Sequence, residues 1–186
     1  MMMTNAYTAE IMNELNRTVQ LISEEESERL TNAILESKKI FVAGAGRSGL
    51  MSRAFAMRLM HLGFVAYVVG ETVTPGLEQE DILIIGSGSG ETKSLVSMVE
   101  KAKSLEATVA AITIYPESTI GKIADIAIRL PGSPKDKSDS GYKTIQPMAS
   151  LFEQTLLLFY DATILRLMSK QGNDSNKMFG RHANLE

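Results

Sequence analysis

Short apolar segments alternate with amphipathic stretches through the middle of the chain. Nearly continuous apolar runs lie at residues 39–43, 64–69, 81–85, 108–114 and 125–130. Runs of this length are typical of strands that are covered on both faces. Helical patterns at about residues 49–62, 91–105 and 118–123 separate most of these strands. The alternation predicts an α/β fold: a doubly wound five-stranded parallel sheet of order 2-1-3-4-5, with helices on both faces.

Helical patterns also precede the first strand and follow the last. Apolar residues recur at helical spacing within 4–22, and Ser23 with Glu26 fits a capping box for a second helix. After the fifth strand, residues 131–146 are rich in Pro, Gly, Ser and charge and predict a loop or lid. Residues 147–170 then predict a long helix that is apolar on almost every side. Such a helix fits a buried core, but helices of a doubly wound sheet lie outside, so the pattern favours an oligomer interface.

Composition and charge narrow the class of protein. The chain has 186 residues, a net charge of −3, no Cys and two His. Its length suits a single domain, with N-terminal helices in residues 1–37 and a C-terminal tail at 171–186. An acidic chain without a basic run gives nucleic acid little to bind, and two distant His without Cys offer no metal cluster. Without a leader pattern or a membrane-length apolar run, we expect a cytoplasmic protein with no membrane partner.

The stretch at residues 83–104 reads as a strand, a tight loop and a helix. Its loop combines three glycines with three hydroxyl side chains: Gly86, Gly88 and Gly90, and Ser87, Ser89 and Thr92. Glycines let a ligand approach the backbone, and the unpaired N–H groups and dipole of a helix start favour an anion. The loop therefore predicts a phosphate site. It is not a Walker loop, because Thr92 precedes Lys93 where that motif requires Gly, so nucleotide hydrolysis is not expected.

A second glycine loop follows the first strand. Residues 44–49 form a literal G-x-G-x-x-G before a helix, and Glu71 lies past the second strand, as in a dinucleotide fingerprint. Arg47 and Ser48, however, put a charge and a hydroxyl where backbone alone would hold a pyrophosphate. One pyrophosphate would also leave the loop at 86–92 unexplained. We therefore favour two loops facing one crevice and keep the dinucleotide as the lesser alternative.

With these loops placed, the chain resembles the sugar isomerase (SIS) domain family over about residues 30–170. The segment SGSGET at 87–92 looks like the phosphosugar loop of that family, and Ser48 matches the hydroxyl of its first loop. The resemblance implies that the substrate is bound by Arg47, Ser48, Ser87, Gly88, Ser89 and Thr92. Within the family, AFAMRLMHLG, QPMASLFEQ and the terminal RHANLE are similar to the 6-phospho-3-hexuloisomerases.

This similarity implies an enzyme that interconverts D-arabino-hex-3-ulose 6-phosphate and D-fructose 6-phosphate through an enediol, in formaldehyde fixation by the ribulose monophosphate pathway. No metal or organic cofactor is implied. The matched catalytic residues are Glu153, as the base that moves a proton between neighbouring carbons, and His182, for ring opening or proton transfer to sugar oxygens. The implied partners are a phosphorylated sugar, further copies of the chain in a dimer or tetramer, and functional coupling to 3-hexulose-6-phosphate synthase. The tail would fold over its own crevice or cross to a neighbour's.

Plainer interpretations stay open. Glu153 suits a carboxylate at a helix start, His182 a solvated tail, and Arg47 a solvated helix start. SIS domains also serve as sugar-phosphate sensors in transcription regulators, although the residues before the first strand are too few for a DNA-binding domain as well. A third alternative is an isomerase that acts on another sugar phosphate.

Overall fold

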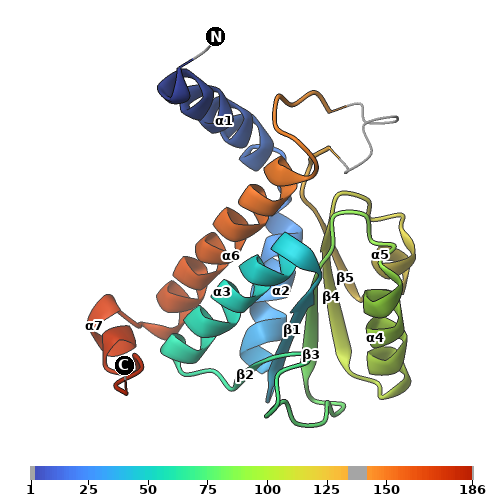
Figure 1. Cartoon of the computed structure of the whole chain (residues 1–186). Coiled ribbons are helices and arrows are strands. Elements are labelled where there is room, and N and C mark those ends of the chain that lie inside the picture. Colours follow the sequence, from blue (N-terminus) through green and yellow to red (C-terminus); the bar gives the residue numbers. More distant parts are fainter. Residues whose placement is uncertain (1–2, 134–141, 186) are drawn as a thin grey trace.

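A parallel sheet forms the middle layer of the molecule. The computed structural model describes residues 3–133 and 142–185. Within these residues five parallel strands lie in the order β2-β1-β3-β4-β5 (Figure 1). Their bounds are Ile40–Gly44 for β1, Ala66–Val68 for β2, Ile82–Gly86 for β3, Thr108–Thr113 for β4 and Ile126–Arg129 for β5. The predicted fold class and strand order are confirmed.

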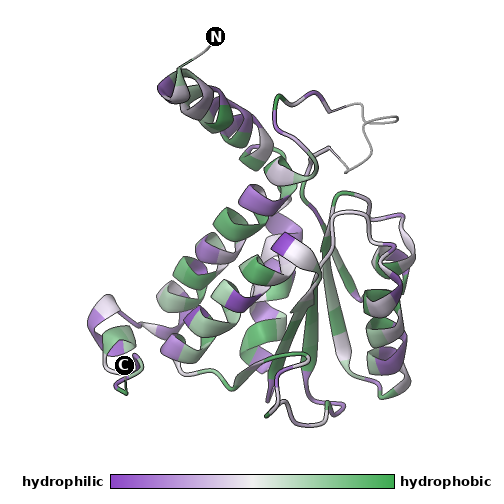
Figure 2. Cartoon of the chain, viewed as in Figure 1, coloured by the Kyte–Doolittle hydropathy of each residue, from purple (hydrophilic) through white to green (hydrophobic). Residues whose placement is uncertain are grey.

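Helices cover both faces of the sheet. On one face lie α2 (Glu24–Glu36), α3 (Gly46–Leu62) and α6 (Ser150–Gln171), and on the other α4 (Lys93–Ser104) and α5 (Thr119–Ile123). Ile82 and Ile84 belong to the core of the first face, and Leu83 and Ile85 to that of the second. Side chains of a strand alternate between faces, so a strand with a core on each side must be apolar throughout. The strands are accordingly hydrophobic along their length (Figure 2).

Two further helices lie at the ends of the chain. α1 (Thr4–Val19) packs against α6, and the short α7 (Ser175–Phe179) packs against α3. The sequence interpretation missed α7, which begins where Asp174 accepts a hydrogen bond from the Lys177 N–H at 2.9 Å. In the part of the chain that the structure describes, no helix has the length and apolar character needed to cross a membrane.

The second strand is shorter than predicted because the end of α3 uses its first residues. Gly63 takes a φ of 95° and closes that helix, and the Phe64 N–H donates back to the Leu59 carbonyl at 3.0 Å. This pair of features is typical of a helix terminated by glycine. Extended backbone therefore begins two residues later than the apolar run. The predicted loop or lid at 131–146 lies largely outside the described residues, which resume at Tyr142.

The long helix α6 packs mainly against other helices of its own chain. It contacts α1, α2 and α3, and its buried side chains are Ser150, Leu151, Phe152, Glu153, Thr155, Leu156, Phe159, Tyr160, Thr163, Ile164 and Leu167. Leu158 and Leu165 stay 44% and 66% exposed. Most of the apolar surface that suggested an interface is thus covered by neighbouring helices, and only a narrow stripe is left.

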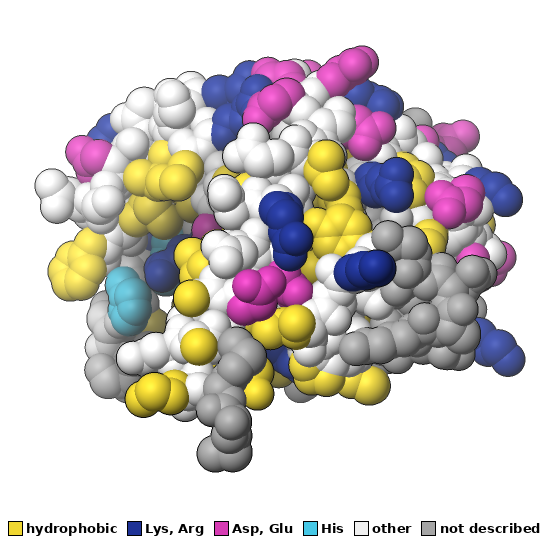
Figure 3. Space-filling view, turned by 90° about the horizontal axis from the view of Figure 1, so that it is seen from above, with side chains coloured by type: hydrophobic (Ala, Val, Ile, Leu, Met, Phe, Trp, Pro, Cys, Tyr) yellow, Lys and Arg dark blue, Asp and Glu magenta, His cyan; other side chains and the backbone are white. Residues whose placement is uncertain are grey.

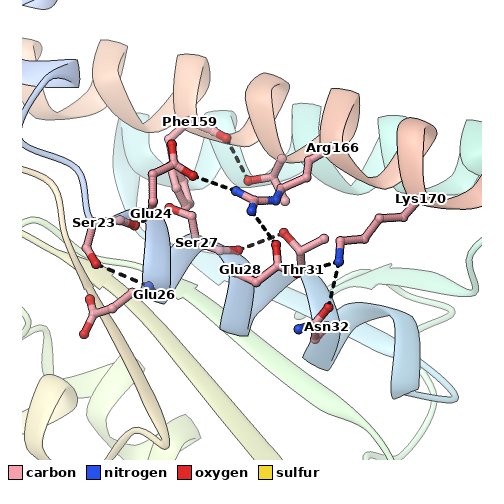
Figure 4. Close-up of polar contacts among 11 residues, drawn as sticks. Ser23, Glu24, Glu26, Ser27, Glu28, Thr31, Asn32, Phe159, Arg166 and Lys170 are labelled. Carbon is pink, nitrogen blue, oxygen red and sulfur yellow. Dashed lines mark hydrogen bonds and ion pairs between the residues drawn. The ribbon is translucent and has the colours of Figure 1, made fainter.

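Ion pairs hold α2 against the second half of α6 (Figure 4). Arg166 donates to Glu24 at 2.8 Å and also pairs with Glu28, while Lys170 contacts Glu28 and Asn32. These side chains are partly or largely exposed, so we expect each pair to add little stability by itself. The network joins the two helices at the end of α6 that lies away from the glycine loops.

Candidate active site

A cleft opens at the carboxyl ends of β1 and β3, where the order of the strands reverses. It has a volume of about 300 Å³. Its walls are formed by Ala45, Ser48, Gly86, Ser87, Gly88, Ser89, Thr92, Leu95, Ile114, Ala149, Phe152 and Glu153. Ligands of open α/β sheets bind at such a position. Figure 3 looks onto this end of the molecule, where acidic, basic and hydrophobic side chains lie close together.

The loop at residues 87–92 is held from outside by the next strand and helix. Its Ser87 N–H donates to the Ile112 carbonyl at 3.0 Å, and the Gly88 carbonyl accepts from the Ile114 N–H at 3.2 Å. One turn further, the Gly90 carbonyl accepts from the Ile120 N–H of α5 at 3.1 Å. These bonds fix the loop backbone before any ligand is present.

The same loop keeps a set of donors available. Within the described residues, hydrogen-bond acceptors are lacking for the backbone N–H groups of Gly88, Ser89, Thr92, Lys93 and Ser94. The Ser87 and Ser89 hydroxyls accept from the N–H groups of Gly90 and Glu91, which leaves their own hydrogens free to donate. A phosphate has acceptor oxygens enough for several of these donors, and it lies at the positive end of the α4 dipole. The free donors of the predicted loop are therefore suited to an anion.

Glu91 is turned away from the anion site. Its two carboxylate oxygens accept from the backbone N–H and the hydroxyl of Thr119, at 2.7 and 2.8 Å. These hydrogen bonds, from the backbone first and the side chain second, lower the pKa of Glu91. A carboxylate beside a phosphate would repel it, so its position at the start of α5 explains how an acidic residue fits into this loop.

Glu153 approaches the cleft from the first turn of α6. It is 5% exposed, and its Oε2 lies 3.1 Å from Arg47 Nε. That contact has ion-pair distance but not hydrogen-bond geometry, so in the described residues Oε2 has no hydrogen-bond partner. Arg47 also donates to the Ser150 hydroxyl at 3.1 Å. The cleft thus joins an anion site to a buried carboxylate with an unused acceptor, as proton transfer on a phosphorylated substrate requires.

The floor and apolar wall were not found from the sequence. Phe152 is fully buried and forms the wall beside Glu153. Below the loop, a Cβ on Gly86 would lie 2.9 Å from Leu156 and 3.1 Å from the Tyr160 hydroxyl. Burial raises the pKa of Tyr160, so this side chain stays a neutral phenol. Both aromatic residues follow the helical period of α6, which marks them as core and gives no sign that they border a cleft.

His182 is not brought to this cleft. Its ring stacks on His61 at a centroid distance of 5.3 Å, at the end of α3 remote from Ser48. Nearby, Arg181 donates to the carbonyls of His61 and Leu62. With a rise of about 1.5 Å per residue, the length of α3 from Ser48 to His61 is roughly 20 Å. Within one chain, the tail does not cover the cleft.

The G-x-G-x-x-G match has a packing explanation. A Cβ on Gly49 would lie 2.6 Å from the Gly44 carbonyl oxygen, so α3 can start this close to β1 only with glycine. Glu71, the acidic residue of the dinucleotide interpretation, forms an ion pair with Arg53 on the surface of α3. In residues 3–133 and 142–185, no three His, Asp or Glu side chains are grouped to hold a metal ion.

Comparison with known proteins shows which family the chain resembles. Residues 33–160 match the model of the SIS domain. The chain is 64% identical over 185 residues to the 3-hexulose-6-phosphate isomerase of Bacillus subtilis, with 100% of both chains covered. It is 42% identical to the enzyme of that name from Methanocaldococcus jannaschii, over 84% of this chain and 82% of the other.

A solved structure agrees with these relatives. It is that of a hypothetical protein from Methanococcus jannaschii, for which a molecular function of 3-hexulose-6-phosphate isomerase was inferred. It superposes with a TM-score of 0.84 at 35% identity and covers 97% of this chain and 99% of the other. The chain therefore belongs to the SIS domain family, among relatives named 3-hexulose-6-phosphate isomerase.

Proposed function

We propose that this chain is an isomerase that interconverts D-arabino-hex-3-ulose 6-phosphate and D-fructose 6-phosphate. One observation carries the proposal: a single cleft of about 300 Å³ holds the anion site of residues 87–92 and, on its other wall, the Glu153 carboxylate. A hexulose phosphate has one dianionic end to anchor and a carbonyl to move. The substrate named for the relatives fits both requirements.

The chemistry needs one proton to move between neighbouring carbons. Glu153 removes the proton from C2 of the 3-ketose. The electrons of the broken C2–H bond form the C2=C3 double bond of an enediol, and the C3 oxygen gains a proton. The enediol then loses the proton of its C2 oxygen, its C3 regains a proton from Glu153, and the carbonyl is left at C2. Atoms and electrons balance without an oxidant or reductant, so the step requires no cofactor. Arg47, beside Glu153, donates to a sugar oxygen in this scheme.

The phosphate is bound by Ser87, Gly88, Ser89 and Thr92, with Ser48 on the facing loop. Each donor to a charged group contributes about 1.5 to 3 kcal/mol. Addition of formaldehyde to C1 of a 2-pentulose 5-phosphate gives a hexulose phosphate whose carbonyl is at C3, so the enzyme acts after a synthase of 3-hexulose 6-phosphate in the ribulose monophosphate pathway.

The test is turnover in deuterated water with a set of ketose and aldose phosphates. We expect deuterium at C3 of the fructose 6-phosphate that is formed from the hexulose 6-phosphate, and at C2 of the hexulose 6-phosphate in the reverse direction. Glu153→Gln should abolish turnover while phosphate binding is kept. Asp161→Asn removes an exposed carboxylate from the same helix and should leave both unchanged. A wild-type protein that binds sugar phosphates but never turns them over would support the sensor alternative.

The proposal includes a homo-oligomer in which His182 serves a neighbouring chain. Exposed apolar side chains on the paired helices α3 and α6 support assembly: Leu50, Met57, Leu158 and Leu165 are 58%, 55%, 44% and 66% exposed. Since His182 lies remote from its own cleft, a catalytic role for it requires the cleft of another copy.

A mixing experiment tests this sharing. His182→Ala keeps Arg181 and its contacts with the end of α3, and Glu153→Gln keeps the tail. Hybrid assemblies of the two variants contain some sites with both intact residues, so activity should return on mixing. If subunits exchange and no activity returns, His182 does not act in a neighbour's site.

A further inference from the structure

A buried carboxylate outside the cleft fixes the segment that leads into α6. Glu14, on α1, is 1% exposed. Its Oε1 accepts from the Ile145 N–H at 2.7 Å, and its Oε2 accepts from the Thr144 hydroxyl at 2.6 Å and from Gln146 Nε2 at 2.9 Å. Three consecutive residues of one segment thus converge on a single carboxylate. In the described residues Glu14 has no ion-pair partner within 4.0 Å, so these donors replace its lost hydration.

The charge of Glu14 is kept by these contacts. Burial acts to raise its pKa, but the hydrogen bonds from Thr144, Gln146 and Ile145 outweigh burial and lower the pKa. One turn along α1, the Thr18 hydroxyl lies 2.8 Å from the Tyr142 hydroxyl. The segment at residues 142–146, which is otherwise partly exposed, is therefore fastened to α1 at both of its ends.

This fastened segment is directly connected to the catalytic wall of the cleft. After Gln146 the chain turns at Pro147, and Met148 takes an unfavourable φ of 57°. The Ser150 N–H donates to the Pro147 carbonyl, and the Glu153 N–H donates to the Ala149 carbonyl at 3.0 Å. Ala149, Phe152 and Glu153 then line the cleft. Only Pro147, Met148 and Ala149 separate the segment from Ser150, where α6 begins.

We propose that Glu14 is a positioning residue for catalysis, which sets the place of the Glu153 carboxylate through the 142–146 segment. The proposal rests on the proposed function. The phosphate loop belongs to β3 and α4, and in the described residues its hydrogen bonds involve no part of α1 or of this segment. Loss of the Glu14 contacts should therefore impair proton transfer and leave phosphate binding intact. If Glu14 served stability alone, its loss would not reduce kcat while leaving phosphate affinity unchanged.

The test compares Glu14→Gln with Glu10→Gln, which removes a carboxylate from the exposed side of the same helix. Glu14→Gln keeps the size of the side chain but replaces one acceptor oxygen by a donor group that faces other donors. We expect kcat to fall about 10- to 100-fold, because misplacement of a catalytic group by about 1 Å costs up to roughly 100-fold. The dissociation constant of inorganic phosphate should change by less than about twofold, and Glu10→Gln should resemble the wild type.

Amide hydrogen exchange provides a readout that does not need turnover. In Glu14→Gln the Ile145 amide, and then that of Glu153, should exchange faster, while amides of β3 stay protected. If Glu14→Gln does not fold, Thr144→Val removes one of the three donors and should show the same separation with a smaller loss of kcat.

Two results would overturn the proposal. One is an unchanged kcat in a folded variant whose Ile145 amide has lost protection, and the other is a parallel loss of kcat and phosphate affinity. An inactive wild type that binds phosphate would refute the proposed function alone, since the exchange of Ile145 and Glu153 would still show whether Glu14 holds the start of α6.

Discussion

Replacement of Gly90 by Ala tests whether the phosphate loop is as closely fastened as its contacts indicate. Gly90 has a φ of 63°, and a Cβ there would lie 2.5 Å from the Ser118 Cβ and closer still to its hydroxyl. The left-handed backbone costs Ala about 1 to 2 kcal/mol. Overpacking against Ser118, which caps α5, adds about 1 to 3 kcal/mol. The expected loss is therefore about 2 to 5 kcal/mol in the free energy of unfolding.

Gly172→Ala is the matched control for this variant. Gly172 ends α6 with a φ of 62°, and nothing lies within 4 Å of a Cβ there. Gly172→Ala should therefore lose only the cost of the left-handed backbone, about 1 to 2 kcal/mol, because the added methyl group meets no neighbour. For a chain of this size each kcal/mol corresponds to about 2 to 4 °C in Tm.

The assays are urea unfolding and titration with inorganic phosphate. Ala at position 90 must displace either Ser118 or the loop, so we expect phosphate affinity to fall about tenfold or more, as for one lost hydrogen bond to a charged group of about 1.5 kcal/mol. The control should bind phosphate normally. If Gly90→Ala loses no more stability than Gly172→Ala, or binds phosphate as tightly as the wild type, the described packing of loop and α5 is refuted.

The remaining predictions concern the loop hydroxyls, acid stability and assembly. Ser87→Ala with Ser89→Ala should raise KM strongly, whereas Ser104→Ala, at the far end of the helix α4 that follows the loop, should not; equal KM values would contradict the anion site. The pKa of Glu91 lies below its ordinary value of 4.5, so its stabilising effect is complete above about pH 4.5 and is lost as the pH falls through the lower pKa. Glu91→Gln should therefore show a flatter decline of stability under acid than the wild type, and parallel curves in urea unfolding would speak against it. Leu165→Asp should lower the oligomeric order seen in sedimentation, whereas Asp161→Asn should not; a wild type that sediments as a 20.3 kDa monomer would rule out assembly.

The sheet and the phosphate loop could be predicted because their signals are local. An apolar run such as that of β3 has to be a strand with a core on each side, and Ser87 to Thr92 combine glycines and hydroxyls at one helix start. The long-range polar contacts could not be predicted in this way. The approach of Arg47 to Glu153 joins two segments far apart in sequence, and no periodic pattern reports which side chains meet.

Two residues, Glu14 and Arg181, show most clearly which contacts a sequence pattern does not predict. In the helical pattern of α1, Glu14 counts as a polar position, yet it is buried because donors from a distant segment surround it. For the tail, the sequence predicted a position over a cleft, its own or a neighbour's. Its place against α3 depends on Arg181, whose side chain reaches two carbonyls at the end of that helix. The spacing of hydrophobic residues does not predict such a contact between one flexible side chain and backbone oxygens.

The order in which the cleft receives its parts during synthesis follows from where they lie in the chain. The two glycine loops, with the strand and helix that fasten them, are complete once α5 has been made, whereas the Glu153 carboxylate is added only with α6. In the proposed function, the phosphate site and the Glu153 base thus lie in separate stretches of the chain. A change confined to the start of α6 could remove catalysis and leave a binding protein, without any alteration to the part of the fold that holds the phosphate.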